Sequence, residues 1–196
     1  MLFKTTGALE RMHIFGAWRS VFIVNDSRRM NTVWGTETSF LLPHSESDDV
    51  FMGVYFSGDC SDENLGSLRK SEIYDKNLKL SGKSKELMRA IVLAGRQMIA
   101  HSDINCNRFA TVDFTGKRAV IVEQDWLSTQ QSSYQIFVDT LGDGRIIYNL
   151  MFVAPKNLYA KYVEQARASF ETALWRTQFD PKEALHLLED APENEL

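Results

Sequence analysis

The chain has 196 residues, 44% of them hydrophobic, and a formal net charge of −4 from 26 acidic and 22 basic side chains. This length suits one domain with a sizeable core, and the ordinary composition argues against disorder over most of the chain. The acidic balance, with no clustered basic stripe, argues against direct binding to nucleic acid, because neutralised phosphates supply most of the affinity in such complexes.

No segment of the sequence reaches the ~18 apolar residues that a membrane-spanning helix needs. The first residues lack the uninterrupted apolar run of a secretory signal. We therefore expect a soluble cytoplasmic protein, or an extracytoplasmic one if a leader has been removed. The two cysteines, Cys60 and Cys106, form no Cys-x-x-Cys pair, which disfavours a structural zinc site. Two thiols in a reducing compartment are the favoured interpretation, and one disulfide between them is the alternative.

The first half of the chain is predicted to contain strands and then helices. Runs rich in aromatic and β-branched residues favour a strand or two over residues 12–24, and single strands over 32–42 and 50–56. Helices are predicted over residues 61–79 and 84–100. The second helix has the stronger pattern, because its apolar residues recur at steps of three and four.

The second half predicts a meander of four strands followed by a helix. The strands are predicted over residues 109–115, 118–127, 133–141 and 145–153. Strands in such a row are antiparallel, because the Gly116-Lys117 and Gly142-Asp143-Gly144 connections are short turns. Ala154-Pro155 ends the last strand, since proline cannot donate to a strand ladder. An amphipathic helix is predicted over residues 157–176, and a short helix over 181–188.

This order of elements predicts an α+β fold, an antiparallel sheet with its meander over residues 109–153, flanked by helices. Residues 1–30 are an N-terminal extension, for which strands added to the sheet are one interpretation. Residues 31–178 form the single domain. Residues 179–196 are a polar C-terminal tail that includes the short helix.

The sequence holds few patterns that indicate chemistry. It contains no nucleophile elbow, no phosphate-binding glycine loop and no histidine pair at metal-binding spacing, so we predict no catalytic, cofactor or metal site. Glu123 and Asp125 share one face of a strand, and Asp113 could lie across from them. With a histidine brought in by the fold, these carboxylates could perform acid–base hydrolysis. The favoured interpretation is a solvated strand face.

Aromatic side chains are the other notable feature of the meander. An antiparallel sheet can leave one face partly uncovered, and an aromatic face exposed in this way would be a partner site. The candidate partner-binding residues are Trp126, Tyr134, Phe137 and Tyr148. For any one of them a place in the core is the favoured interpretation.

Residues 36–176 resemble the PsbP/DcrB-like α/β/α sandwich family. The resemblance is carried by Gly116-Lys117-Arg118-Ala119, Asp125-Trp126, Tyr134 to Val138, Arg145 to Tyr148, Phe152 to Pro155, and the helix from Tyr159 through Ala168-Ser169-Phe170. Phe40 to Pro43 match the family's opening strand. The family includes extrinsic photosystem subunits, a Ran-binding nuclear transport factor, periplasmic lipoproteins and chaperones for secreted effectors. The resemblance implies protein binding and provides no catalytic residues to carry over.

We therefore expect a non-enzymatic protein-binding module, an adaptor or chaperone, that uses a sheet face or the groove beside the C-terminal helix. The expected partner is another protein, and a homo-oligomer is a close variant. A small hydrolase built on Glu123 and Asp125 with a histidine is one alternative. A structural subunit of a larger assembly is another.

Overall fold

The computed structural model describes residues 1–5, 7–23, 34–41, 49–57, 104–142 and 147–179. The helices predicted over residues 61–79, 84–100 and 181–188 lie outside the described residues, as do Cys60 and most of the predicted Gly142–Gly144 turn. No helix among the described residues is long and apolar enough to cross a membrane.

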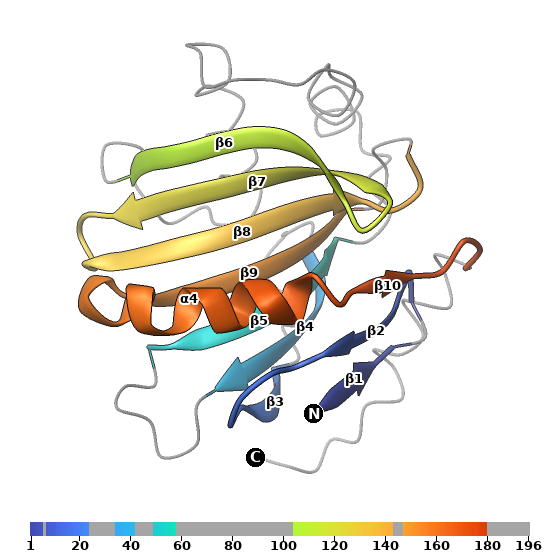
Figure 1. Cartoon of the computed structure of the whole chain (residues 1–196), viewed down its shortest axis with the longest axis horizontal. Helices are drawn as coiled ribbons and strands as arrows, with labels where there is room; N and C mark the ends of the chain where they lie inside the picture. Colours follow the sequence, from blue (N-terminus) through green and yellow to red (C-terminus); the bar gives the residue numbers. More distant parts are fainter. Residues whose placement is uncertain (6, 24–33, 42–48, 58–103, 143–146, 180–196) are drawn as a thin grey trace.

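A large antiparallel sheet of seven strands forms the body of the molecule (Figure 1). In spatial order its strands are β3 (Arg19–Ile23), β4 (Trp34–Leu41), β5 (Phe51–Ser57), β9 (Ile147–Pro155), β8 (Gln131–Asp139), β7 (Lys117–Trp126) and β6 (Ile104–Phe114). Strands β3 to β5 form one half of this sheet, and the β6 to β9 meander forms the other half. The two halves meet where β5 pairs with β9. The predicted α+β class and antiparallel meander are confirmed.

The meander follows from its turn chemistry and its apolar pattern. Thr115 and Gly116 both have positive φ, 47° and 80°, the conformation of a two-residue hairpin that matches strand twist. β8 and β9 are buried along almost their whole length, as expected of central strands covered on both faces. The first strand of the meander was predicted to begin at residue 109, but it begins at Ile104, because the polar residues before Phe109 also pair with β7, as far as Trp126.

A second, three-stranded sheet joins the two ends of the chain. It consists of β1 (Leu2–Lys4), β2 (Leu9–His13) and β10 (Leu174–Trp175), in the order β1-β2-β10. The predicted strand region over residues 12–24 is divided between β2 in this sheet and β3 in the large sheet. Gly16, with φ +96°, lies in the segment that connects them.

Helix α4 (Lys156–Phe170) follows β9 directly and packs on one face of the large sheet (Figure 1). It buries Val163, Ala166, Ser169 and Phe170. The helix was predicted to continue to residue 176, but it ends at Phe170. The backbone turns tightly there, since Thr172 and Ala173 donate to the carbonyls of Ser169 and Phe170, and the following residues pair with β2.

The main core lies between this face of the sheet, α4 and the N-terminal segment. Its largest fully buried side chains include Phe152 from β9, Phe170 from α4, and Leu9 and Met12 from β2. The N-terminal residues are therefore part of the hydrophobic core, which the small sheet and α4 share.

Candidate functional site

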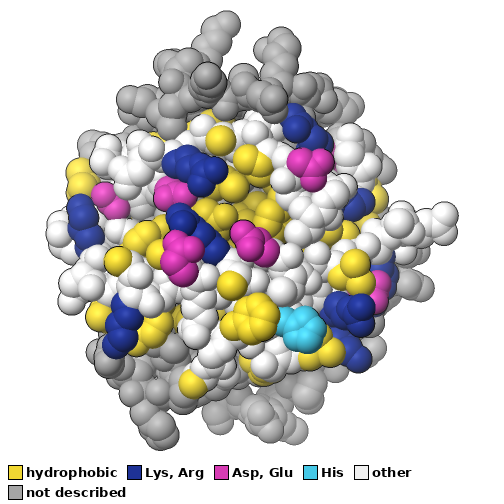
Figure 2. Space-filling model, viewed as in Figure 1, with side chains coloured by type: hydrophobic (Ala, Val, Ile, Leu, Met, Phe, Trp, Pro, Cys, Tyr) yellow, Lys and Arg dark blue, Asp and Glu magenta, His cyan; other side chains and the backbone are white. Residues whose placement is uncertain are grey.

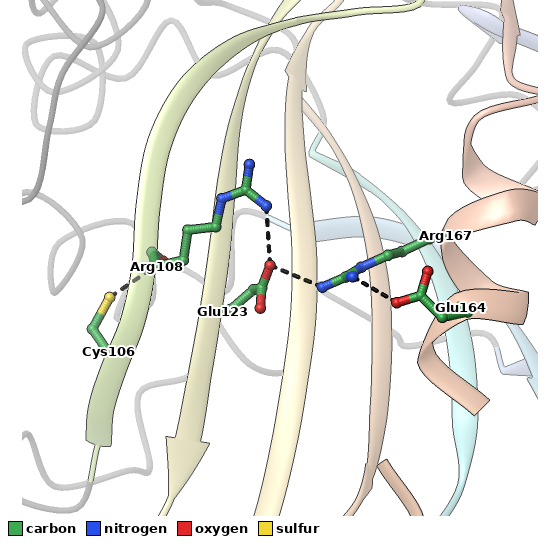
Figure 3. A network of polar contacts seen from close by, with 5 residues as sticks. All are labelled: Cys106, Arg108, Glu123, Glu164 and Arg167. Atoms are coloured by element: carbon green, nitrogen blue, oxygen red, sulfur yellow. Dashed lines mark hydrogen bonds and ion pairs between the residues drawn. The ribbon is translucent and has the colours of Figure 1, made fainter. Parts of the chain in front are cut away.

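A row of alternating charges crosses the molecular surface from β6 to α4 (Figure 3). Arg108 of β6 donates to Oε1 of Glu123 on β7 at 3.2 Å, and Arg167 of α4 donates to the same oxygen at 3.0 Å. Arg167 also donates to Oε1 of Glu164, one helical turn away, at 2.7 Å. We call Arg108, Glu123, Arg167 and Glu164 the charge ladder.

The sheet register explains how the charge ladder forms. Arg108 and Glu123 are cross-strand partners, immediately after an irregularity in the pairing of β6 with β7. On the next strand Glu123 faces Tyr134. The guanidinium of Arg167 lies 4.8 Å from the centre of the Tyr134 ring, a cation–π geometry. Phe170 stacks on the same ring at 6.3 Å between centroids. Packing of the helix on Tyr134 therefore brings Arg167 to Glu123.

The electrostatics of the ladder keep Arg167 charged. Burial lowers the pKa of its guanidinium, but the carboxylates of Glu123 and Glu164 outweigh that effect and raise the pKa above its ordinary value. The Arg167 side chain is 29% exposed and that of Glu123 is 20% exposed, whereas Arg108 and Glu164 reach 49% and 75%. The ladder therefore has a half-buried centre and two exposed ends.

Asp125, two residues beyond Glu123 on the same strand face, has separate partners. Ser132 donates to its Oδ1 at 2.6 Å, and Lys156 lies 3.4 Å from its Oδ2. Burial raises the pKa of Asp125, but hydrogen bonds from Ser132 and Asn107 and the nearby Lys156 outweigh it, so the pKa lies below its ordinary value. This carboxyl is ionised near neutral pH and is poorly suited to donate a proton.

The predicted acid–base grouping is only partly assembled. Glu123 and Asp125 do share a strand face, but Asp113 pairs with Arg118 at the other end of the hairpin, so the expectation that it lies across from them was wrong. Within the described ranges, no histidine bonds to either carboxylate. His13 is exposed on β2, and the other three histidines lie outside those ranges. The same ranges contain no group of ligands able to hold a metal ion.

The four candidate aromatic residues are all buried and lie on two different faces. Tyr134 and Tyr148 belong to the core on the α4 side, at 6% and 4% exposure. Trp126 and Phe137, at 3% and 2% exposure, lie on the opposite face, where Trp126 packs with Met151 and Val153. The set does not form one surface, and partner binding by these residues stays a prediction. Tyr134 alone contacts the charge ladder.

Sequence reasoning missed the two arginines of the ladder. On the predicted C-terminal helix, the spacing of three between Glu164 and Arg167 is the available signal of an ion pair. Nothing local marks Arg108, because its role depends on the register between β6 and β7. Both residues are identified only through contacts between elements.

An apolar strip lies beside the ladder, on the same face of the large sheet. Ala110 and Val112 of β6 are partly exposed, and their cross-strand partners Ile121 and Ala119 on β7 are buried. Figure 2 shows apolar surface between charged side chains in this part of the molecule. The combination of apolar strip and charge ladder is our candidate functional site.

Comparison with known proteins shows the fold. No family model and no curated protein sequence matches the chain. Among solved structures, the solution structure of cyanobacterial PsbP (CyanoP) from Synechocystis sp. PCC 6803 is similar with a TM-score of 0.59 and 11% identity, over 90% of this chain and 92% of that one. The crystal structure of PA94, a protein of unknown function from Pseudomonas aeruginosa, matches over 91% and 98% at 12% identity, with a TM-score of only 0.46. The predicted PsbP/DcrB-like fold is confirmed, and at this identity the likeness extends to the fold alone.

Proposed function

We propose, from the PsbP-like fold as premise, that this chain is a non-enzymatic protein-binding module, an adaptor or chaperone, that contacts its partner beside α4. The observation that carries the proposal is the charge ladder bordering the apolar strip of β6 and β7. Protein interfaces commonly combine an apolar centre with a charged rim, and arginine is enriched among the residues that dominate their affinity.

The ladder provides the fixed geometry that a docking surface requires. Glu123 holds the exposed Arg108 and the half-buried Arg167 through one oxygen atom, at 3.2 and 3.0 Å. Each guanidinium retains further N–H donors. Since the side chains are already held by Glu123, less rotamer entropy is lost when a partner carboxylate or carbonyl accepts those bonds.

A charge reversal at the exposed end of the ladder tests the proposal. The tagged full chain and its Arg108→Glu variant are expressed in cells of the source organism, and co-purifying proteins are quantified by mass spectrometry. We expect a protein captured in stoichiometric amount by the wild type to fall about tenfold or more with Arg108→Glu, because the variant opposes charge complementarity at the rim.

The matched control is Lys161→Glu, which reverses the charge of an exposed residue on α4. This variant should capture the partner as the wild type does. Circular dichroism should show that both variants are folded, with a modest fall in the unfolding midpoint for Arg108→Glu, because it places a second carboxylate opposite Glu123. Equal capture by Arg108→Glu and the wild type, or no stoichiometric protein at all, would refute the proposal.

The partner could also be a second copy of the chain, and light scattering distinguishes this case. A wild-type dimer that becomes monomeric in Arg108→Glu, but not in Lys161→Glu, would identify the site beside α4 as a self-association surface. We also propose a reducing compartment, the cytoplasm, consistent with the sparse use of cysteine in the sequence.

A further inference from the structure

The outer face of the small sheet combines exposed apolar groups with basic ones. Leu2 and Lys4 of β1 pair with His13 and Arg11 of β2, and Leu174 of β10 also pairs with Arg11. Cross-strand partners point to the same side of a sheet, so these five side chains share a face. The opposite face carries Phe3 and Met12, which pack into the core. We call the first of these the outer face.

The apolar side chains of the outer face are unusually accessible. Leu2 is 42% exposed and Leu174 is 41% exposed. Phe15, two residues beyond His13, is 45% exposed and stacks on the His13 ring at 6.3 Å between centroids. Single exposed apolar residues are common on protein surfaces, but several gathered on one face indicate an interaction site.

The basic groups of the outer face are available to a partner. Among the described residues, neither Lys4 nor Arg11 makes an ion pair. Figure 2 shows basic side chains beside the histidine, on the side of the molecule where β1 and β2 lie in Figure 1. The chain as a whole carries a net charge of −4, so the outer face is a local positive region on an acidic protein.

The backbone below the outer face is fixed by hydrogen bonds to the C-terminal segment. The backbone N–H of His13 donates to Oγ1 of Thr172 at 2.8 Å, and that of Phe15 donates to Oγ of Ser169 at 3.0 Å. Arg176 donates to the carbonyl of Thr5 at 2.8 Å. The exposed groups are therefore presented by a rigid framework, which lowers the entropic cost of binding.

We propose that the outer face is a second docking surface, which binds an acidic segment of another protein that presents carboxylates and apolar side chains on the same face. Its carboxylates pair with Lys4 and Arg11, and its apolar side chains cover Leu2, Phe15 and Leu174. An anionic membrane is the weaker match, because surfaces that bind such lipids through charge usually gather about four to eight basic residues, and the outer face has two permanent cations.

The test is a binding titration of the full chain with a fluorescent synthetic peptide of about ten residues. Glu and Leu or Phe take turns at every second position, with Ser between them, so that both kinds of side chain lie on one face of the extended peptide. Anisotropy should show saturable binding that weakens as salt is added. The matched peptides replace Glu with Lys, or the apolar residues with Gly, and neither should bind.

Variants assign the binding to the outer face. We expect at least about fivefold weaker binding from Arg11→Glu and from Phe15→Ser, and an unchanged affinity for Lys161→Glu and Arg108→Glu. The Arg108 variant also separates this inference from the proposed function, since each surface can fail without the other.

Three outcomes would overturn the inference. They are equal binding of the Lys peptide, no saturable binding of the Glu peptide by a chain with its wild-type unfolding midpoint, and the same affinity in Arg11→Glu. Co-sedimentation with vesicles of phosphatidylserine and phosphatidylcholine, lost in Arg11→Glu while the peptide does not bind, would assign the face to a membrane instead.

Discussion

The indole nitrogen of Trp18 donates a hydrogen bond to Oε1 of Gln165 at 3.0 Å, although the two residues are 147 positions apart in the sequence. Trp18 is 7% exposed and meets Phe152 and Tyr162 edge to face, at 6.5 and 6.3 Å between ring centroids. These contacts hold the N-terminal segment against the main core, between α4 and the large sheet.

Replacement of Trp18 by alanine should strongly destabilise the protein. The free energy of unfolding should fall by about 3–5 kcal/mol, because a large buried aromatic side chain is removed. Trp18→Phe keeps most of the packing but loses the hydrogen bond to Gln165. It should therefore lower the free energy of unfolding by a smaller amount, about 1–2 kcal/mol. Urea unfolding followed by circular dichroism measures both values. Equal losses in the two variants would contradict the separate roles of packing and hydrogen bonding.

Gly16 should tolerate alanine poorly, because its backbone and its surroundings both oppose a side chain. Its φ of +96° is strained for an L residue, and an added Cβ would overlap the side-chain amide of Gln165. We expect Gly16→Ala to lower the free energy of unfolding by about 2–3 kcal/mol. Gly116→Ala is the matched control, since its φ is +80° with nothing within 4 Å of the added Cβ. It should cost about 1 kcal/mol from backbone strain alone.

A double-mutant cycle shows whether the overlap with Gln165 is responsible. In a Gln165→Ala background the amide is absent, so Gly16→Ala should cost about as much as Gly116→Ala does. An unchanged cost would show that the penalty comes from the backbone conformation or from another neighbour, and that Gln165 does not restrict this position.

Local sequence signals predicted the meander well, because its strands and turns are specified by neighbouring residues. Gly116 supplies the positive φ of the hairpin, and the apolar runs of β8 and β9 mark central strands. The same signals placed the end of α4 too late. The residues after Phe170 still match a helical pattern, but they pair with β2, and that contact cannot be read from the sequence near Trp175.

The candidate site was predicted only in part, for the same reason. Glu123 and Asp125 were identified from the period of a strand, and their shared face was correct. The partners of Glu123 come from β6 and α4, about 15 and 44 positions away in sequence. A cross-strand register and a helix docking geometry decide those contacts, and neither has a local pattern.

Loss of the Glu123 carboxylate should destabilise the fold moderately. Glu123→Gln leaves the half-buried Arg167 with Glu164 as its remaining carboxylate. The pair is neither fully exposed nor fully buried, so we expect a loss of about 1–2 kcal/mol, between the values typical of those extremes. Glu164→Gln, at the 75% exposed end, should cost less than about 0.5 kcal/mol.

The comparison of these two variants by urea unfolding, at low and at high salt, checks the assignment. The effect of Glu123→Gln should persist at high salt, whereas any effect of Glu164→Gln should disappear, because exposed charges are screened more strongly. Similar small losses in both variants would mean that Glu123 does not hold Arg167 in solution.

Stability at alkaline pH should depend on Tyr148. Burial is the main cause that raises the pKa of this phenol from 10.0 to about 12, against hydrogen bonds from the backbone of Leu9 and Ala8 that lower it. Its ring also meets Trp175 edge to face at 5.7 Å between centroids. The group is therefore held neutral by the contact between β9 and the N-terminal segment.

Because the pKa of Tyr148 is raised in the folded state, its contribution to the free energy of unfolding decreases as pH rises. The unfolded chain releases the Tyr148 proton more readily than the folded one, so the contribution is fully present below about pH 10 and is lost as pH rises toward 12. Two pKa units correspond to a loss on the order of 2–3 kcal/mol.

Tyr148→Phe should be less stable near pH 9, because it lacks the hydroxyl's hydrogen bonds, but its free energy of unfolding should fall less steeply above pH 10. If the Tyr148→Phe curve runs parallel to the wild type up to pH 12, then Tyr148 ionises in the folded protein as easily as in the unfolded chain, and the tight contact between β9 and residues 8–9 does not persist in solution.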